Sequence, residues 1–462
     1  MILLAHSYYL QRDSKQFARM KPYPPLATLL AAAVLREQGH EVALFDATFA
    51  SGVADFEQAL ERADPSAMIL MEDNFNFLTK MCTVTRRGDA LAMIRAAAER
   101  GCRVAVNGPD PSDQPALYLS AGAEALVLGE GEMGLAEVAD AWRAGQTDLE
   151  PIGGLVTPGD DGELRHSRSR PPVAALDALP LPAWDLIDVA DYRQAWAGAH
   201  GYFSWNMATS RGCPYRCNWC AKPTFGRRYT QRSPQSVARE MQRLKREVAP
   251  DHIWFADDIF GLSADWIIAF ADEVERRDVR TRFMMQSRVN LMSPDAVAAL
   301  ARAGAEEVWL GVESGSQKIL DAMDKGSTVQ SARNATRTLQ AGGIRVGWFI
   351  QLGYPSESWD DILATRDLLR DEAPDDIGIS VAYPLPGTKF YDRVSAQLGA
   401  RRNWRDTGDL AMLFQGTYDT AFYRQVRDLL HAEAVSPVHD DRPWAELSRR
   451  AADHRSPEPI HV

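Results

Sequence analysis

Short β-rich runs alternate with amphipathic helical runs over the first 146 residues, and this rhythm restricts the possible folds more than any other feature. Helical runs such as LATLLAAAVLREQG and ALAMIRAAAERG each end at a glycine, as a helix C-cap does. Strand–helix alternation predicts a doubly wound parallel sheet. The runs with strand character are 1–6, 41–47, 67–73, 103–108 and 125–129.

The same rhythm returns from about residue 204 and predicts a second α/β domain. Six strand-like runs begin at residues 205, 252, 282, 307, 344 and 377. Six βα units make a partial version of the eightfold barrel, in which chemistry takes place at the strand ends. The region between the two rhythms is predicted to be a linker, in which PIGGLVTPGDDGELRHSRSRPP suggests a small β-hairpin or a loop and LDALPLPAWDLID a proline-punctuated connector. The predicted parts are an α/β domain over 1–146, this linker over 147–195, a partial barrel over 196–391 and a mainly helical C-terminal extension over 392–462.

Composition and charge exclude several classes of protein. The chain has 462 residues, of which 45% are hydrophobic and 25% charged, as in ordinary globular proteins. The formal net charge of −12 argues against a nucleic-acid partner. The N-terminus lacks the pattern of a signal peptide, and the longest helix-like apolar run, 26–35, is too short to span a bilayer. We therefore expect a cytoplasmic protein without a membrane span.

Three of the five cysteines are crowded into TSRGCPYRCNWCAK, residues 209–222. Cys213, Cys217 and Cys220 have the spacing C-x3-C-x2-C, which in a reducing compartment favours metal binding or redox chemistry. Structural zinc needs four ligands, usually from two cysteine pairs, and the sequence offers no second pair and no histidine nearby. Thiolates hold iron–sulfur clusters, and three of them leave one iron of a cubane open to a substrate or cofactor.

This motif, with Trp219 in the aromatic position, resembles the C-x3-C-x-aromatic-C hallmark of the radical S-adenosylmethionine superfamily. The resemblance implies a [4Fe–4S] cluster on Cys213, Cys217 and Cys220, with S-adenosylmethionine chelated to the open iron. One-electron reduction then gives a 5′-deoxyadenosyl radical. The electron is expected from an external donor of the flavodoxin or ferredoxin type.

Polar residues at the barrel strand ends are candidates for contacts to S-adenosylmethionine. Asp257 and Asp258 follow the second strand, where a carboxylate suits the methionyl ammonium, and capping of the next helix is the alternative. Gln286 and Arg288 share one face of the third strand. The guanidinium suits the cofactor carboxylate, and a structural salt bridge is the alternative. The resemblance, which includes the fourth-strand signature GVESG, also implies cofactor contacts for Trp219, Glu313 and Ser314.

An α/β domain placed before such a barrel resembles the cobalamin-binding subclass, which includes methylases and proteins like the anaerobic Mg-protoporphyrin monomethyl ester cyclase. The stretches KPYPPLATLLAAAVLREQGHEV, NGPDPS and ALVLGEGE carry this resemblance. The D-x-H-x-x-G motif that ligates cobalt is absent, because neither His6 nor His40 follows an aspartate by two residues, and Asp110 replaces the histidine of the family's NGGPH-like turn. We therefore expect cobalamin bound without a histidine ligand, and a domain that no longer binds cobalamin is the alternative. The expected cobalamin contacts are Tyr23, Asn74, Asn107, Gly108, Pro109, Gly129, Glu130 and Gly131.

The resemblance implies a cobalamin-dependent methyltransferase that acts on an unactivated carbon of a small molecule through a 5′-deoxyadenosyl radical and methylcobalamin. A non-methylating reaction on the same scaffold, oxidative cyclisation or ring rearrangement, is the alternative. Methylthiolation is disfavoured because it needs a second cysteine triad, and only Cys82 and Cys102 remain. A carrier protein would not need charged residues along successive strand ends. Trp254, Trp309 and Trp348 suit either a bulky apolar substrate or a packed core. No catalytic acid or base is identified.

Overall fold

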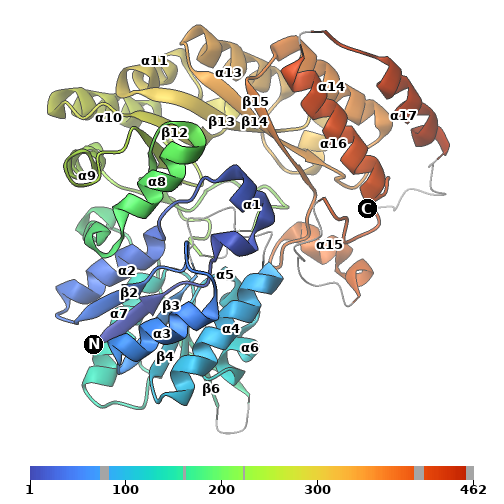
Figure 1. Ribbon diagram of the computed structural model, residues 1–462. Helices are drawn as coiled ribbons and strands as arrows, with labels where there is room; N and C mark the ends of the chain where they lie inside the picture. Colours follow the sequence, from blue (N-terminus) through green and yellow to red (C-terminus); the bar gives the residue numbers. More distant parts are fainter. Residues whose placement is uncertain (73–82, 160–162, 222–223, 400–409, 437, 454–462) are drawn as a thin grey trace. The chain divides into compact units, whose positions relative to one another are not determined.

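The computed structural model describes all residues except 73–82, 160–162, 222–223, 400–409, 437 and 454–462. The described chain forms two compact units (Figure 1). The first unit takes in described residues of 1–213 and 222–257, and the second takes in those of 214–221, 258–402 and 408–462. The domain limits expected at residues 146, 195 and 391 stay predictions.

The first unit contains the predicted parallel sheet, whose order is β2-β1-β3-β4-β5-β6-β7. Its first five strands pair in parallel. The strand order reverses between β1 and β3, and doubly wound folds bind their ligands at such a switch point. The last two strands, a hairpin in the predicted linker, extend the sheet in antiparallel fashion. The strands are β1 (Ile2–Ala5), β2 (Val42–Phe45), β3 (Ala67–Met71), β4 (Arg103–Asn107), β5 (Ala125–Val127), β6 (Leu155–Pro158) and β7 (Leu164–His166).

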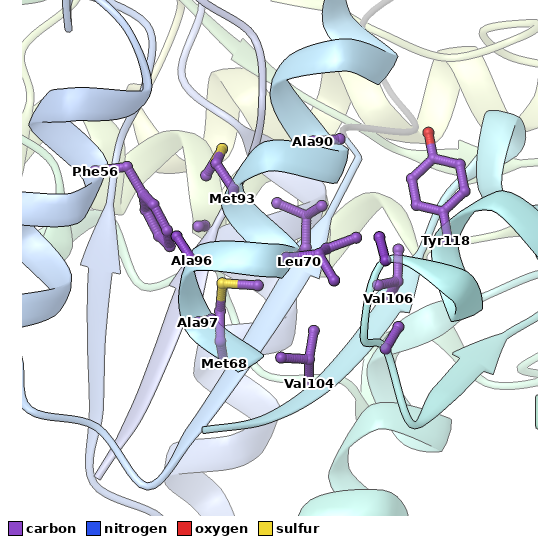
Figure 2. Close-up of a cluster of buried hydrophobic side chains, with 14 of the residues drawn as sticks. Phe56, Met68, Leu70, Ala90, Met93, Ala96, Ala97, Val104, Val106 and Tyr118 are labelled. Atoms are coloured by element: carbon purple, nitrogen blue, oxygen red, sulfur yellow. The ribbon is translucent and has the colours of Figure 1, made fainter. Parts of the chain in front are cut away.

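Helices cover this sheet on both faces, which is why its central strands are almost continuously apolar. Figure 2 shows Phe56 and Met93 packed over Met68 and Leu70, two residues that alternate along β3 and so share one face. Helices α2 and α7 pack together on the sheet's other face. The helices of this region are α1 (Ser14–Arg19), α2 (Leu26–Glu37), α3 (Val53–Ala63), α4 (Thr83–Glu99), α5 (Pro109–Asp113), α6 (Pro115–Ser120) and α7 (Gly131–Arg143).

The second half of the chain has the alternation of a partial (βα)6 barrel, as predicted. In the first unit β8 (Ser204–Met207) pairs in parallel with β11 (His252–Phe255). In the second unit β12 (Arg282–Ser287), β13 (Ala305–Glu313), β14 (Arg345–Leu352) and β15 (Asp376–Val381) pair in parallel in this order. The helices that follow the first five of these six strands are α9 (Pro234–Glu247), α10 (Ala264–Arg277), α11 (Pro294–Ala303), α13 (Val329–Ala341) and α14 (Trp359–Glu372).

Several elements were not predicted individually. The predicted linker runs into α8 (Val189–His200), a helix capped by the Asp188 side chain at its start and by Gly201, with φ of 74°, at its end. The C-terminal extension is mainly helical, as predicted. Among the described helices, none is both long and apolar enough to cross a bilayer. The remaining elements are β9 (Ser210–Arg211), β10 (Thr230–Gln231), α12 (Gln317–Ala322), α15 (Lys389–Leu398), α16 (Thr420–Val435) and α17 (Arg442–Asp453).

Candidate functional site

The cysteine loop begins directly after β9, at a backbone position that only glycine fits. Gly212 has φ of 77°, and a Cβ placed on it would lie 2.2 Å from the carbonyl oxygen of Arg228. The next residue, Cys213, is half-buried, and its N–H donates to the carbonyl of Gly226 over 3.4 Å. The glycine of the TSRGC stretch is therefore required by the close approach of two backbone segments.

Asn218 fixes the part of the loop that lies in the second unit, although the sequence interpretation did not single it out. Its N–H donates to the carbonyl of Met323 over 3.0 Å, and its side-chain amide donates to the carbonyl of Ala322 over 2.8 Å. Its side-chain oxygen accepts the hydroxyl of Tyr354 over 2.7 Å, and its backbone oxygen accepts the N–H of Phe390 over 3.0 Å. The sequence did contain a signal for this role, because an amide side chain inside a cysteine motif offers both a donor and an acceptor for hydrogen bonds that fix the loop.

Cys217 and Arg288 are brought together in the second unit. Nη1 of Arg288 lies 3.4 Å from Sγ of Cys217, and its guanidinium carbon lies 3.8 Å from the ring centre of Tyr215. The other guanidinium nitrogens donate to the carbonyl of Lys325 and, over 3.3 Å, to Oδ1 of Asn290. A contact of Arg288 with the carboxylate of S-adenosylmethionine stays a prediction.

These surroundings fit a thiolate-ligated cluster, because a cation and hydrogen-bond donor beside the sulfur complements the negative charge that thiolate ligands bring to an iron–sulfur cluster. None of the described cysteines forms a disulfide. Within the part of the chain that the structure describes, no three Cys, His, Asp or Glu side chains are already arranged to hold a metal ion. The assignment of Cys213, Cys217 and Cys220 as ligands therefore rests on the motif and stays a prediction.

The other predicted contacts in the second unit are held by neighbouring side chains. Trp219 packs beside the hydrophobic cluster that contains Tyr354 and Phe390. Glu313 has a left-handed backbone with φ of 66°, and its Oε1 lies 2.6 Å from Nζ of Lys325. Ser314 is buried, and its hydroxyl accepts the N–H of Ser316 over 3.1 Å. Their contacts with S-adenosylmethionine stay predictions, and Lys325 is a residue that the sequence interpretation missed.

The two aspartates after β11 have different environments. Asp257 is fully buried, and its Oδ1 accepts the N–H of Thr209 over 3.0 Å and the hydroxyls of Thr209 and Ser210 over 2.7 and 2.5 Å. Burial raises the pKa of Asp257 to about 6, although these hydrogen bonds oppose the shift. Asp257 thus stabilises the segment that leads to the cysteine loop. Asp258, like Gln286, is only half-buried and retains some access to solvent.

The end of β4 and the turns after β4 and β5 contain six of the predicted cobalamin contacts, and these residues are closely packed. The side-chain amide of Asn107 donates to the carbonyls of Val127 and Gly129 over 2.8 and 3.0 Å. A Cβ on Gly131, the first residue of α7, would lie 2.6 Å from Cγ of Asn107. A Cβ on Gly108 would lie 2.3 Å from the side chain of Glu72, and Pro109 begins α5. These residues build the carboxyl edge of the sheet, and their contact with cobalamin stays a prediction.

Glu130 belongs to a buried ion cluster in the first unit. Nη1 of Arg211 lies 2.8 Å from Oε2 of Glu130, and Nη2 lies 2.6 Å from Oε1 of Glu132. Glu130 also accepts the N–H of Val173 over 3.1 Å. The pKa of Glu130 is raised by burial, while the adjacent Arg211 lowers it in part. The GEGE turn is therefore joined to β9, two residues before Cys213.

The structure gives no support for a ligand contact at Tyr23 or Asn74, the remaining predicted cobalamin contacts. The ring of Tyr23 packs against Trp196 and Trp254, at centroid distances of 5.2 and 4.7 Å, and its hydroxyl lies 3.1 Å from that of Ser204. This places Tyr23 in an aromatic core of the first unit. Asn74 lies outside the described residues, as does Cys82. Cys102 is buried, as expected for a small apolar side chain.

No histidine of the turn after β1 is open to a ligand in the first unit. Nε2 of His6 lies 2.8 Å from Oδ1 of Asp46, to which it donates, and Nδ1 accepts the N–H of Tyr8 over 3.3 Å. Asp110, in the position of the family histidine, pairs with Arg87. Binding of cobalamin without a histidine ligand stays a prediction.

A buried arginine at the carboxyl edge of the first sheet also fits a polar cofactor. Arg86 is buried and its Nε lies 2.5 Å from Oε2 of Glu72, yet its Nη2 atom has no hydrogen-bond partner among the described residues. A buried donor of this kind is costly unless a ligand or water satisfies it. Arg86 would therefore be available to an acceptor group of a cofactor at this edge.

The three tryptophans singled out in the sequence divide into core and sheet-face positions. Nε1 of Trp348 donates to Oγ1 of Thr336 on α13 over 3.1 Å, so Trp348 belongs to the helix-facing core, as Trp254 belongs to the core around Tyr23. Trp309 and Phe349 share the opposite face of the second-unit sheet, with ring centroids 4.9 Å apart. Nε1 of Trp309 donates to Oε1 of Glu307 over 2.6 Å, which fixes the indole ring.

Comparisons with known proteins agree with both halves of this description. The Radical SAM superfamily matches residues 207–369, and the B12 binding domain matches residues 20–139. An uncharacterized methyltransferase of Pyrococcus horikoshii is 28% identical over 83% of this chain and 81% of its own length. An anaerobic magnesium-protoporphyrin IX monomethyl ester cyclase of Rubrivivax gelatinosus is 25% identical over 59% of this chain, which spans 49% of that protein.

A solved structure with the same fold is the radical S-adenosylmethionine methyltransferase TsrM of Kitasatospora setae with cobalamin and a [4Fe–4S] cluster bound. It has a TM-score of 0.68 at 21% identity and covers 87% of this chain and 76% of its own. The two matched domains imply a [4Fe–4S] cluster with S-adenosylmethionine, and cobalamin, as the cofactors of this enzyme. The chain belongs to the radical S-adenosylmethionine enzymes that carry a cobalamin-binding domain.

Proposed function

We propose that the protein is a cobalamin-dependent methyltransferase that adds a methyl group to an unactivated carbon of a small molecule. The observation that carries this proposal is the presence of a B12 binding domain and a C-x3-C-x2-C radical S-adenosylmethionine domain in one chain. The relative from Pyrococcus horikoshii, which matches most of the chain, bears a methyltransferase name and so supports it. When bound, the cluster with S-adenosylmethionine supplies radical chemistry, and cobalamin supplies a methyl carrier.

The chain's own residues contribute position and electrostatics to this reaction. Asn218 holds the cysteine loop against the turn at residues 322–323, and Arg288 places a positive charge beside Cys217. Asp257 and Gly212 hold the strand and turn that lead to Cys213. Fixed geometry of this kind is what a protein adds to a cofactor reaction.

A bulky, largely apolar substrate is part of the proposal. The pair of Trp309 and Phe349 supports it, because these rings lie on the face of the second-unit sheet that does not pack against α13. Aromatic rings of fixed orientation provide a stacking surface for a planar or apolar group. Oxidative cyclisation is the second candidate, supported by the cyclase from Rubrivivax gelatinosus, of which this chain spans less than half.

Product analysis under anaerobic conditions tests the proposal. The enzyme is reconstituted with iron, sulfide and cobalamin, reduced with a flavodoxin or with dithionite, and given S-adenosylmethionine carrying a deuterated methyl group. We expect both 5′-deoxyadenosine and cobalamin-dependent S-adenosylhomocysteine. Formation of 5′-deoxyadenosine alone would support cyclisation, and absence of both from protein with a full cluster would refute the proposal. A Cys217→Ala variant serves as the control and is expected to form no 5′-deoxyadenosine.

A further inference from the structure

Arg288 lies buried beside Cys217 in the second unit, and the residue that accepts its hydrogen bond, Lys325, forms a buried ion pair with Glu313. Arg288, Lys325 and Glu313 are all less than one-tenth exposed. Arg288 reaches Sγ of Cys217 with Nη1 over 3.4 Å, and Nζ of Lys325 reaches Oε1 of Glu313 over 2.6 Å. The three groups therefore carry one positive charge in excess. Arg288 brings its positive charge within hydrogen-bond distance of the Cys217 sulfur.

Lys325 holds Arg288 in place. Nη2 of Arg288 donates to the backbone carbonyl of Lys325, so a second guanidinium nitrogen is fixed beside the one that reaches the sulfur. The Lys325 side chain in turn crosses Gly311, where a Cβ would lie 2.7 Å from Nζ. Gly311 thus leaves the space in which the ammonium meets Glu313. The backbone of Lys325 is set by a tight turn, with φ of 52° at Asp324 and 64° at Gly326.

The cysteine loop is attached to the same turn. The N–H of Asn218, the residue after Cys217, donates to the carbonyl of Met323 over 3.0 Å. Its side-chain amide reaches the carbonyl of Ala322 over 2.8 Å and Oδ2 of Asp324 over 3.2 Å. The sulfur and the guanidinium are therefore both anchored to residues 322–325. Their separation is set by the fold of this unit rather than by one mobile side chain.

We propose that Arg288, positioned by Lys325, raises the reduction potential of the iron–sulfur cluster through its hydrogen bond and positive charge at the Cys217 sulfur. Reduction adds one electron to the cluster and makes it more negative, and a nearby cation stabilises that reduced form. Hydrogen bonds to the sulfurs and local charge are established determinants of cluster potential. The inference rests on the cluster and is independent of whether the enzyme methylates its substrate.

Redox titration of the reconstituted protein, followed by electron paramagnetic resonance, tests this inference. We expect Arg288→Met to lower the equilibrium constant for cluster reduction by about tenfold or more, which for one electron is ~59 mV. Arg288→Lys, which keeps the charge but not the planar donor, is expected to recover part of the shift. Arg370→Met is the matched control, because Arg370 is a partly buried arginine that pairs with Glu433, and no change in potential is expected.

Two further variants separate electrostatics from general disruption of the loop. Lys325→Met removes a positive charge and should lower the potential, whereas Glu313→Gln removes a negative charge and should raise it. Damage to the loop would move both variants in the same direction, and that result would overturn the proposal. An unchanged potential in Arg288→Met with full iron content would also overturn it.

A measurement on the native protein covers the case in which Arg288→Met fails to bind a cluster. Protein labelled with ¹⁵N-arginine is reduced and examined by electron spin echo envelope modulation. We expect ¹⁵N coupling to the cluster spin, and Arg370→Met should retain it. If the native protein shows no such coupling, Arg288 does not bond to a cluster sulfur and the proposal fails.

Discussion

Replacement of Arg211 by methionine tests the buried ion cluster that joins the GEGE turn to β9. The Arg211, Glu130 and Glu132 side chains are 4%, 6% and 2% exposed, so the two carboxylates cannot turn to solvent when the guanidinium is removed. Removing one partner of a buried ion cluster costs about 3–5 kcal/mol, because uncompensated charge stays in the interior. We expect the free energy of unfolding of the first unit to fall by about this amount.

Equilibrium urea unfolding of the cofactor-free protein, followed by circular dichroism, measures this loss. The triple variant Arg211→Met, Glu130→Gln, Glu132→Gln removes the stranded charges and should recover most of the stability. Arg103→Met is the matched control, because Arg103 pairs with Glu124 where both side chains are more than one-quarter exposed. Such a pair contributes about 1 kcal/mol or less. A loss in Arg211→Met no larger than that in Arg103→Met would refute the reasoning.

The same variant has a defined dependence on pH. Burial raises the folded-state pKa of Glu130 above the value of about 4.3 in the unfolded chain, and removal of Arg211 takes away a group that lowers this pKa. A group whose pKa is raised by folding stabilises the protein below its unfolded-state pKa, and this stabilisation is lost as the pH rises through the folded-state pKa. Arg211→Met should therefore be closest to the native protein in stability near pH 4 and furthest from it in alkali. An equal loss at both ends of the range would contradict this assignment.

Two further substitutions test single side chains in the second unit. Burial raises the pKa of Glu357 to about 8, so the native protein should lose stability as the pH rises from about 4.5 to about 8. Glu357→Gln should remove this dependence on pH, measured by urea unfolding at pH 5 and 9. Its amide oxygen can still accept the N–H of Gly353. An unchanged slope in Glu357→Gln would place the titration elsewhere. Gly347→Ala should lower the free energy of unfolding by about 1–3 kcal/mol through overpacking, because the new Cβ would lie 2.4 Å from the Trp309 ring. Gly343→Ala is the control: its added Cβ meets nothing within 4 Å, but φ is 72°, so it measures the cost of backbone strain alone.

Periodicity was enough to predict the layers of the fold, because each strand and helix has a side that must be buried. The predicted helical runs LATLLAAAVLREQG and ALAMIRAAAERG, for example, coincide with most of α2 (Leu26–Glu37) and with the second half of α4 (Thr83–Glu99). The hairpin β6–β7 and helix α8 lay in a segment read as a linker. A small hairpin or loop was predicted at the start of this segment, but its pairing with β5 was not, because the two strands pair through a tertiary contact that no local pattern reveals.

The polar contacts of the candidate site were less predictable than the fold. The C-x3-C-x2-C spacing identified the cysteine loop, since covalent spacing is visible in a sequence. The partners of Arg288 were not, because Lys325 lies 37 residues further along the chain and no periodic pattern links the two. Likewise Arg211 meets Glu130 across 81 residues, and only the tertiary structure brings them together.

The ion cluster of the first unit also affects how variants of the GEGE turn should be interpreted. Glu130 was predicted as a cobalamin contact, yet its carboxylate is bonded to Arg211, two residues before Cys213. A Glu130→Ala variant would therefore disturb Arg211 as well as any corrinoid, and a loss of cobalamin would not by itself assign a contact to Glu130. Glu132 has the same partner and stabilises Arg211 from the other nitrogen. Since both carboxylates act on one guanidinium, a true cobalamin contact requires a larger effect of Glu130→Gln than of Glu132→Gln on corrinoid affinity, at equal effects on cluster content.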